Sequence, residues 1–116
     1  MKAVLDASDI IAARETIRDT RVLDEVIKYV TRLLHATRQE DGLSVGASPR
    51  SGLMLLMAAK SLARFAGRDY VTPDDVKESF IPVMRHRVVV SPHAELEGIA
   101  SDEVLSNVME SVEVPR

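Results

Sequence analysis

Residues 46–66 read GASPRSGLMLLMAAKSLARFA, and this stretch decides the fold. Ser48 suits the N-cap of a helix, and Pro49 suits its first position, where a backbone N–H is not needed. Residues 53–59 are apolar on nearly every side, which is typical of a helix at the centre of a bundle. Gly67 follows as the expected C′ residue. The stretch therefore predicts one central helix from Pro49 to about residue 66.

The side chains of this helix allow two further predictions. Met54 and Met57 are interpreted as core filler, because methionine adapts to irregular gaps. Lys60, Arg64 and Arg68 recur every four residues and predict one solvent-facing stripe.

Apolar residues spaced by three and four predict four more helices, at about 9–18, 23–39, 73–84 and 101–112. Serines are the expected caps of the first and the last, Ser8 and Ser101.

The helix expected from residue 73 has a near-complete start signal, because Thr72-Pro73-Asp74-Asp75 supplies a cap, a first-position proline and two acids. Pro82 is expected to kink this helix or to end its first segment. Residues 88–90 are β-branched and predict a short extended piece, for which no partner strand of comparable strength is evident. Residues 93–100 are expected to be an acidic linker.

These elements predict an all-α fold, a small bundle of four to five helices with one short extended segment near residues 87–90. We expect one domain over residues 1–116. Residues 8–91 would form the main bundle, and residues 92–116 an acidic linker followed by the C-terminal helix.

Composition excludes several classes of protein. The net charge of −3 and the 3% aromatic content argue against nucleic-acid binding, particularly against base stacking. The longest apolar run is too short to cross a membrane, and no signal peptide is evident, so we expect a cytoplasmic protein. The absence of cysteine excludes disulfides and thiolate sites, and His35, His86 and His93 lack ligand spacing, so no metal site is predicted.

Arg50 is the residue that points to a ligand. It falls in the first turn of the central helix, where the helix dipole would favour an acid. Helix N-termini bind anions, and a guanidinium can hold a phosphate with two donors. The alternative is an ordinary helix start with Arg50 paired to a surface carboxylate. No Gly-x-x-x-x-Gly-Lys-Ser/Thr loop is present, so the chain cannot hold a nucleotide by itself.

Four motifs in a fixed order carry a family resemblance. They are Thr37-Arg38, Gly46-Ala47-Ser48-Pro49-Arg50, the stretch GRDYVTPDDV at residues 67–76, and Arg85-His86-Arg87. In this order they resemble the C-terminal lid of MoxR-type AAA+ ATPases over about residues 8–91. The lid of the magnesium-chelatase ATPase subunit is similar and is the alternative within this class. The AAA+ core domain with its Walker motifs is absent from this sequence, so we interpret the chain as one domain of a longer protein, with a free-standing lid as the alternative.

The resemblance implies roles for four residues. Arg50 would be the sensor-2 arginine, a catalytic residue of the full-length enzyme that reaches the nucleotide on the core domain. Ala47 and Ser48 would lie beside the nucleotide, next to Arg50. Tyr29 would border the adenine, although a packed tyrosine is the alternative. The implied cofactor is ATP, as Mg-ATP held mainly by the absent core.

The resemblance also implies partners. These are the AAA+ core of the same protein, neighbouring subunits in a hexameric ring, and a client protein, such as one with a von Willebrand A domain; no nucleic acid or membrane is expected. The other arginines are expected in solvated salt bridges, Arg38 with Asp41 and Arg68 with Asp69, with a subunit contact as the alternative. Arg85-His86-Arg87 would close its helix or face a neighbouring subunit. A non-enzymatic helical interaction module and arginine-mediated DNA binding are the competing functions.

Overall fold

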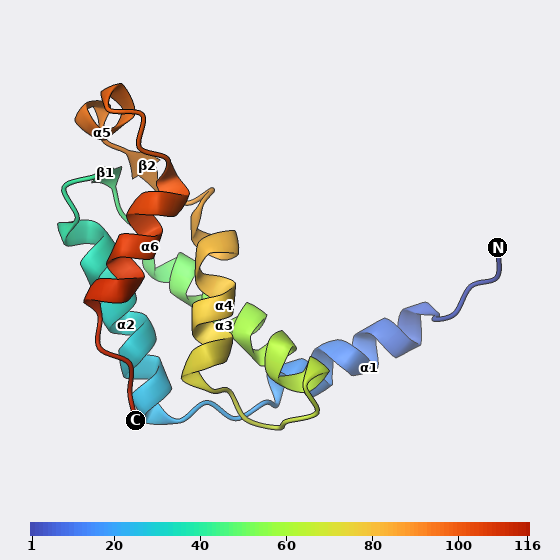
Figure 1. Cartoon of the computed structure of the whole chain (residues 1–116). Coiled ribbons are helices and arrows are strands. Elements are labelled where there is room, and N and C mark those ends of the chain that lie inside the picture. The colour runs from blue at the N-terminus through green and yellow to red at the C-terminus, as the bar shows by residue number, and fades with distance from the viewer.

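The computed structural model describes residues 1–116 and shows a mostly helical domain with a very small sheet (Figure 1). Its helices are α1 (Ala7–Arg18), α2 (Asp24–Gln39), α3 (Pro49–Phe65), α4 (Pro73–Met84), α5 (Pro92–Leu96) and α6 (Ser101–Ser111), and its strands are β1 (Leu43–Val45) and β2 (Val89–Val90). The prediction of a small all-α bundle is confirmed. The additional helix is α5, which lies where the sequence predicted only a linker.

The core lies between α2, α3, α4 and α6. Helix α3 packs along α4, and α6 packs against α2 and α4. Side chains without exposed surface meet there from all four helices, among them Leu33, Leu55, Phe80 and Leu105. The C-terminal helix therefore belongs to the same hydrophobic core as the rest of the bundle.

Helix α3 is less central than its sequence predicts. Leu53, Met54 and Met57 are exposed, whereas Leu55 and Ala59 on the opposite side are fully buried. The interpretation of the two methionines as core filler is therefore wrong. The physical reason is that α2 and α4 cover one side of α3 only, because most of α1 projects away from the bundle instead of covering the other side (Figure 1).

Helix α1 forms an arm with no buried residue (Figure 1). Its N-cap is Asp6, not Ser8, because Asp6 and Asp9 form a reciprocal capping box. Polar contacts from α3 hold its C-terminal end. Lys60 Nζ donates to the Arg18 carbonyl oxygen at 3.0 Å, and Arg64 Nε donates to Thr20 Oγ1 at 2.8 Å.

The predicted lysine–arginine stripe on α3 is therefore not free in solvent. Lys60 and Arg64 hold the end of α1, and Arg68 forms two hydrogen bonds with Asp75 on α4.

The extended segment at the end of α4 has a partner strand. Strands β1 and β2 pair antiparallel, with Leu43 opposite Val90 and Val45 opposite Val89. The loop after α2 thereby returns to the end of α4, which brings two distant parts of the sequence together.

The fourth helix has its predicted bounds, whereas the cap of the last helix differs from the prediction. Helix α4 continues through Pro82 to Met84, so this proline does not end the helix; its ring lies on the exposed side. Helix α6 begins at Ser101 with Ala100 as its N-cap, and no side chain caps it. No helix of the domain is long and apolar enough to span a bilayer.

Candidate functional site

The N-terminus of α3 is built as the sequence predicts. Ser48 is the N-cap in extended conformation, and its Oγ accepts from the Ser51 backbone N–H at 3.2 Å. Pro49 occupies the first turn, where its missing N–H costs nothing. Because a helix N-terminus leaves backbone N–H groups without intrahelical partners, this end of α3 favours a negatively charged ligand.

Arg50 is exposed in the first turn of α3. It forms no ion pair and no side-chain hydrogen bond within the chain. The alternative that Arg50 pairs with a surface carboxylate of this domain is therefore not realised. A cation at the positive end of a helix dipole without a counter-charge can bind an anion from outside the domain.

The segment just before α3 is held by the last turn of α2. The Ala47 backbone N–H donates to Thr37 Oγ1 at 2.9 Å, and Arg38 Nε donates to the Ala47 carbonyl oxygen at 2.9 Å. Arg38 is therefore engaged by the backbone before α3, and the expected pair with Asp41 is absent.

The four residues implied by the resemblance divide into two groups. Ser48 and Arg50 lie at the surface, but Ala47 has only 1% of its surface exposed and Tyr29 has none. Tyr29 packs in the core, and burial raises the pKa of its phenol, whose hydroxyl lacks a hydrogen-bond partner. This burial favours the alternative of a packed tyrosine, and a contact of Tyr29 with the adenine stays a prediction.

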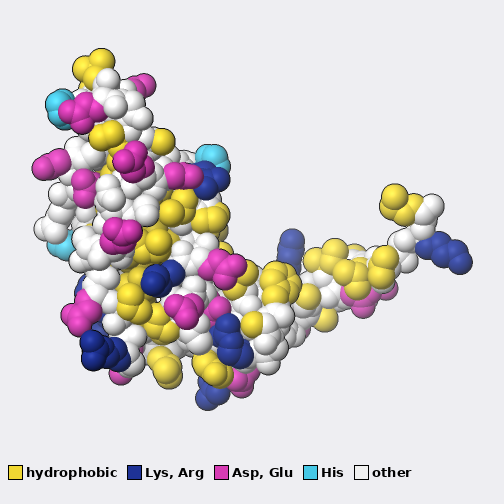
Figure 2. All heavy atoms as spheres, viewed as in Figure 1, with side chains coloured by type: hydrophobic (Ala, Val, Ile, Leu, Met, Phe, Trp, Pro, Cys, Tyr) yellow, Lys and Arg dark blue, Asp and Glu magenta, His cyan; other side chains and the backbone are white.

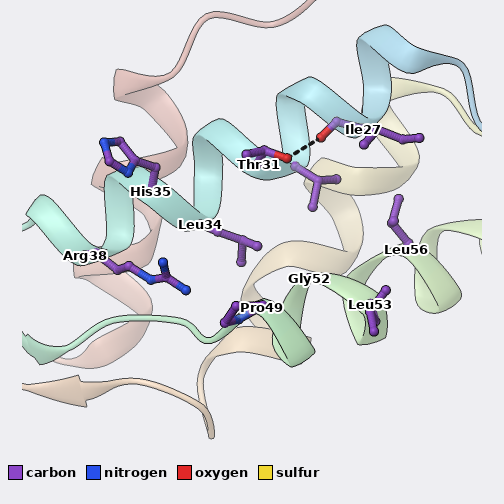
Figure 3. A pocket seen from close by; sticks show the side chains of 10 residues that line it. Ile27, Thr31, Leu34, His35, Arg38, Pro49, Gly52, Leu53 and Leu56 are labelled. Atoms are coloured by element: carbon purple, nitrogen blue, oxygen red, sulfur yellow. Dashed lines mark hydrogen bonds between the residues drawn. The ribbon is translucent and has the colours of Figure 1, made fainter.

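An apolar groove runs between α2 and α3 beside this site (Figure 3). One part has a volume of about 350 Å³ and adjoins a second hollow of about 480 Å³ that shares Ile27, Leu53 and Leu56. We call the two together the α2/α3 groove. Arg38 and Lys60 are its charged lining residues, and no acidic side chain lines it. Arg38 extends from α2 towards Pro49 at one end of the groove (Figure 3).

Two arginine–aspartate pairs differ from the sequence prediction. Arg68 pairs with Asp75 and not with Asp69, through two hydrogen bonds of 2.7 and 2.8 Å. Asp69 instead pairs loosely with Arg21 at 3.4 Å on the surface. Burial opposes ionisation of Asp75, but the hydrogen bonds from Arg68 and Thr72 outweigh it and hold the pKa of this carboxyl below its usual value.

A third pair ties the C-terminal helix to the bundle. Arg85 follows the last residue of α4, and its guanidinium pairs with Asp102 in the first turn of α6. Arg68 and Arg85, the two arginines of the sequence motifs that pair with acids, therefore connect parts of the bundle to each other.

The family model of the AAA lid domain matches residues 35–108, which include α3 with its N-terminal cap, α4 and most of α6. The chain belongs to the AAA lid domain family. The lid elements match a solved structure as well. A crystal structure of a candidate ATPase from Cytophaga hutchinsonii is 30% identical and superposes with a TM-score of 0.88, covering 94% of this chain and 36% of the other.

Curated relatives of this AAA lid domain point to the same class. Chaperone MoxR1 of Mycobacterium tuberculosis is 35% identical over 99% of this chain and 33% of its own length. The magnesium-chelatase subunit ChlI homolog of Methanocaldococcus jannaschii is 31% identical over 72% of this chain and 21% of its own length. The resemblance to MoxR-type lids is thus confirmed. The chain spans about a third of the length of the first curated relatives it matches.

Proposed function

We propose that this AAA lid domain supplies Arg50 as a sensor-2 arginine to Mg-ATP that a core ATPase domain holds. The observation that carries the proposal is the state of Arg50, which is exposed at the capped start of α3 and has no partner within the domain. Ser48 lies beside it at the surface and is the second residue that we assign to the nucleotide side.

The chemistry follows from the guanidinium. Its planar fork can donate two hydrogen bonds to phosphate oxygens, and its charge offsets the negative charge that develops during phosphoryl transfer. If Arg50 touches the triphosphate in one lid orientation only, ATP favours that orientation and hydrolysis removes the preference. The lid would then move with the nucleotide state.

The exposed apolar surface supports a second part of the proposal, contact with the core domain. The α2/α3 groove opens next to the start of α3 and exposes Leu53 and Met57. Helix α1 exposes Ile10 and Ile11, and hydrophobic side chains follow this arm in Figure 2. Contiguous apolar surface of this kind marks a protein contact. We propose that the core domain and a neighbouring subunit of a hexameric ring cover these faces in the full-length protein.

The acidic surface around α5 and α6 is the part of the domain that we assign to contact with a client protein. Acidic side chains gather around α5 and α6 in Figure 2, opposite in character to the α2/α3 groove. MoxR-like and magnesium-chelatase-like ATPases both fit this arrangement, and a von Willebrand A-domain protein is the client that we would test first.

The test replaces Arg50 with alanine in the full-length protein that carries this lid. We expect ATP turnover to fall by about 10²-fold, as for other donors to a transition-state charge. The melting temperature of the isolated lid should change little, because Arg50 is exposed and forms no ion pair or side-chain hydrogen bond within it. Unchanged turnover would refute the assignment.

A further inference from the structure

We infer that Thr37, Arg38 and Gly46 are positioning residues that fix the direction in which Arg50 leaves the domain. We call the three residues with Ala47 the α2–α3 latch. The inference rests on the proposed function of Arg50 and adds to it the parts of the chain that aim this side chain.

Both backbone polar groups of Ala47 form hydrogen bonds with side chains of α2. Its N–H donates to Thr37 Oγ1, and its carbonyl oxygen accepts from Arg38 Nε, each at 2.9 Å. The Thr37 hydroxyl is itself fixed, because it donates to the Leu34 carbonyl oxygen at 2.6 Å. Thr37 has no exposed surface. These bonds therefore connect the backbone before α3 to the last turn of α2.

Gly46 allows the backbone before α3 to lie close to the backbone of α2. A Cβ atom on Gly46 would lie 2.8 Å from the backbone N and Cα of Arg38. Backbone atoms within a helix cannot move aside as the end of a flexible side chain can. Glycine is needed here because there is no room for a side chain. Its backbone conformation does not require glycine, because the φ angle of Gly46 is not positive.

The latch determines the position of Arg50 through two stiff residues. Ser48 is locked as the N-cap by its bond to Ser51, and the ring of Pro49 fixes its own φ angle. No flexible residue separates Ala47 from Arg50. Since a misplacement of about 1 Å can cost about 10²-fold in rate, a loosened latch should misdirect the guanidinium.

The first experiment measures the latch in the 116-residue chain. Thr37→Val removes the hydroxyl and keeps the shape of the side chain, and Thr37→Ser restores the hydroxyl. We expect ¹⁵N order parameters at Ala47 and Arg50 to fall in Thr37→Val and to recover in Thr37→Ser. Thr31→Val is the matched control, because the Thr31 hydroxyl bonds only the Ile27 carbonyl oxygen of its own helix. Unchanged order at residues 46–50 in Thr37→Val would overturn the inference.

The second experiment asks whether the latch acts through Arg50. In the full-length ATPase, Thr37→Val should lower kcat by about ten-fold or more. Combined with Arg50→Ala, it should cause little additional loss, because there is no guanidinium left to aim. Losses that multiply fully would contradict the latch. If Arg50→Ala alone has no effect on kcat, the proposed function fails, and the order parameters still decide whether the latch exists.

Discussion

The ion pair between Arg68 and Asp75 should be the strongest single electrostatic contribution to the stability of this domain. Asp75 begins α4 as part of a capping box with Thr72 and is only 4% exposed. It accepts two hydrogen bonds from Arg68 and one from the Thr72 backbone N–H at 2.8 Å. The change that tests this contribution is Asp75→Asn, which keeps the volume and a cap acceptor but removes the charge.

The expected magnitude follows from the surroundings of the pair. Breaking a fully buried pair costs about 3–5 kcal/mol of unfolding free energy. The Arg68 side chain is 27% exposed and can regain water, and the asparagine can still accept from Thr72. We therefore expect Asp75→Asn to lose about 2–3 kcal/mol, a reduction in melting temperature of about 8–12 °C.

The assay is urea unfolding followed by circular dichroism, with Asp69→Asn as the matched control. Asp69 pairs with Arg21, but both side chains are more than half exposed, so the control should lose less than about 1 kcal/mol. Equal losses in the two variants would refute the reasoning.

The pH dependence supplies a second check. Because the folded-state pKa of Asp75 lies below its usual value of 3.8, its contribution to stability is complete above that pH and disappears as the pH falls through the folded-state pKa. The difference between wild type and Asp75→Asn should therefore shrink below about pH 4. A difference that stays constant to pH 2 would contradict the assigned cause.

Three other substitutions test the packing. Leu105→Ala removes a side chain of α6 without exposed surface and should cost about 2–5 kcal/mol in the same urea assay, whereas a small effect would mean that α6 is a detachable helix. Tyr29→Phe removes a buried hydroxyl without a partner, so the unfolding free energy should stay equal or rise by up to about 1 kcal/mol; a marked loss would reveal a hydrogen bond. Leu53→Ser alters an exposed residue of the α2/α3 groove and should change the unfolding free energy by less than about 0.5 kcal/mol. If the groove is the contact, the same substitution should weaken binding to a separately expressed core domain, measured by calorimetry. Binding at wild-type strength would exclude the groove as the contact.

Local signals in the sequence were sufficient for most of the helices. The start of α4 illustrates this, because a threonine cap, a proline and two acids lie within four residues and the structure forms the corresponding capping box. The start of α3 is equally local, with Ser48 as its cap. Such features depend on residues within one turn of each other.

The features that sequence reasoning missed depend on contacts between distant residues. Strand β1 has three residues, and only its pairing with β2 makes it recognisable. The exposure of Met54 and Met57 follows from α1 projecting away, which no periodicity in α3 encodes. The sequence of α3 alone therefore predicted a helix buried on all sides, because an exposed apolar face has the same composition as a buried one.

The part of the candidate site that depends on neighbouring residues was predictable. Five consecutive residues predicted a capped helix start with Arg50 in its first turn, and the structure places Arg50 at the surface. The role of Arg38 was not evident, because its bond to the Ala47 carbonyl oxygen joins two motifs that a loop separates. Arg68 was assigned to its sequence neighbour Asp69, whereas its guanidinium bonds both carboxylate oxygens of Asp75, seven residues further along the chain.

The most direct test of the central claim is the rate of ATP hydrolysis in the full-length protein with Arg50→Ala, Arg50→Lys and Lys28→Ala. Lys28 is an exposed cation of α2 that does not line the α2/α3 groove, and it controls for the loss of one positive charge. Our account predicts a fall of about 10²-fold for Arg50→Ala, an intermediate rate for Arg50→Lys, which keeps the charge without the fork, and a wild-type rate for Lys28→Ala. Equal rates for Arg50→Ala and Lys28→Ala would contradict it.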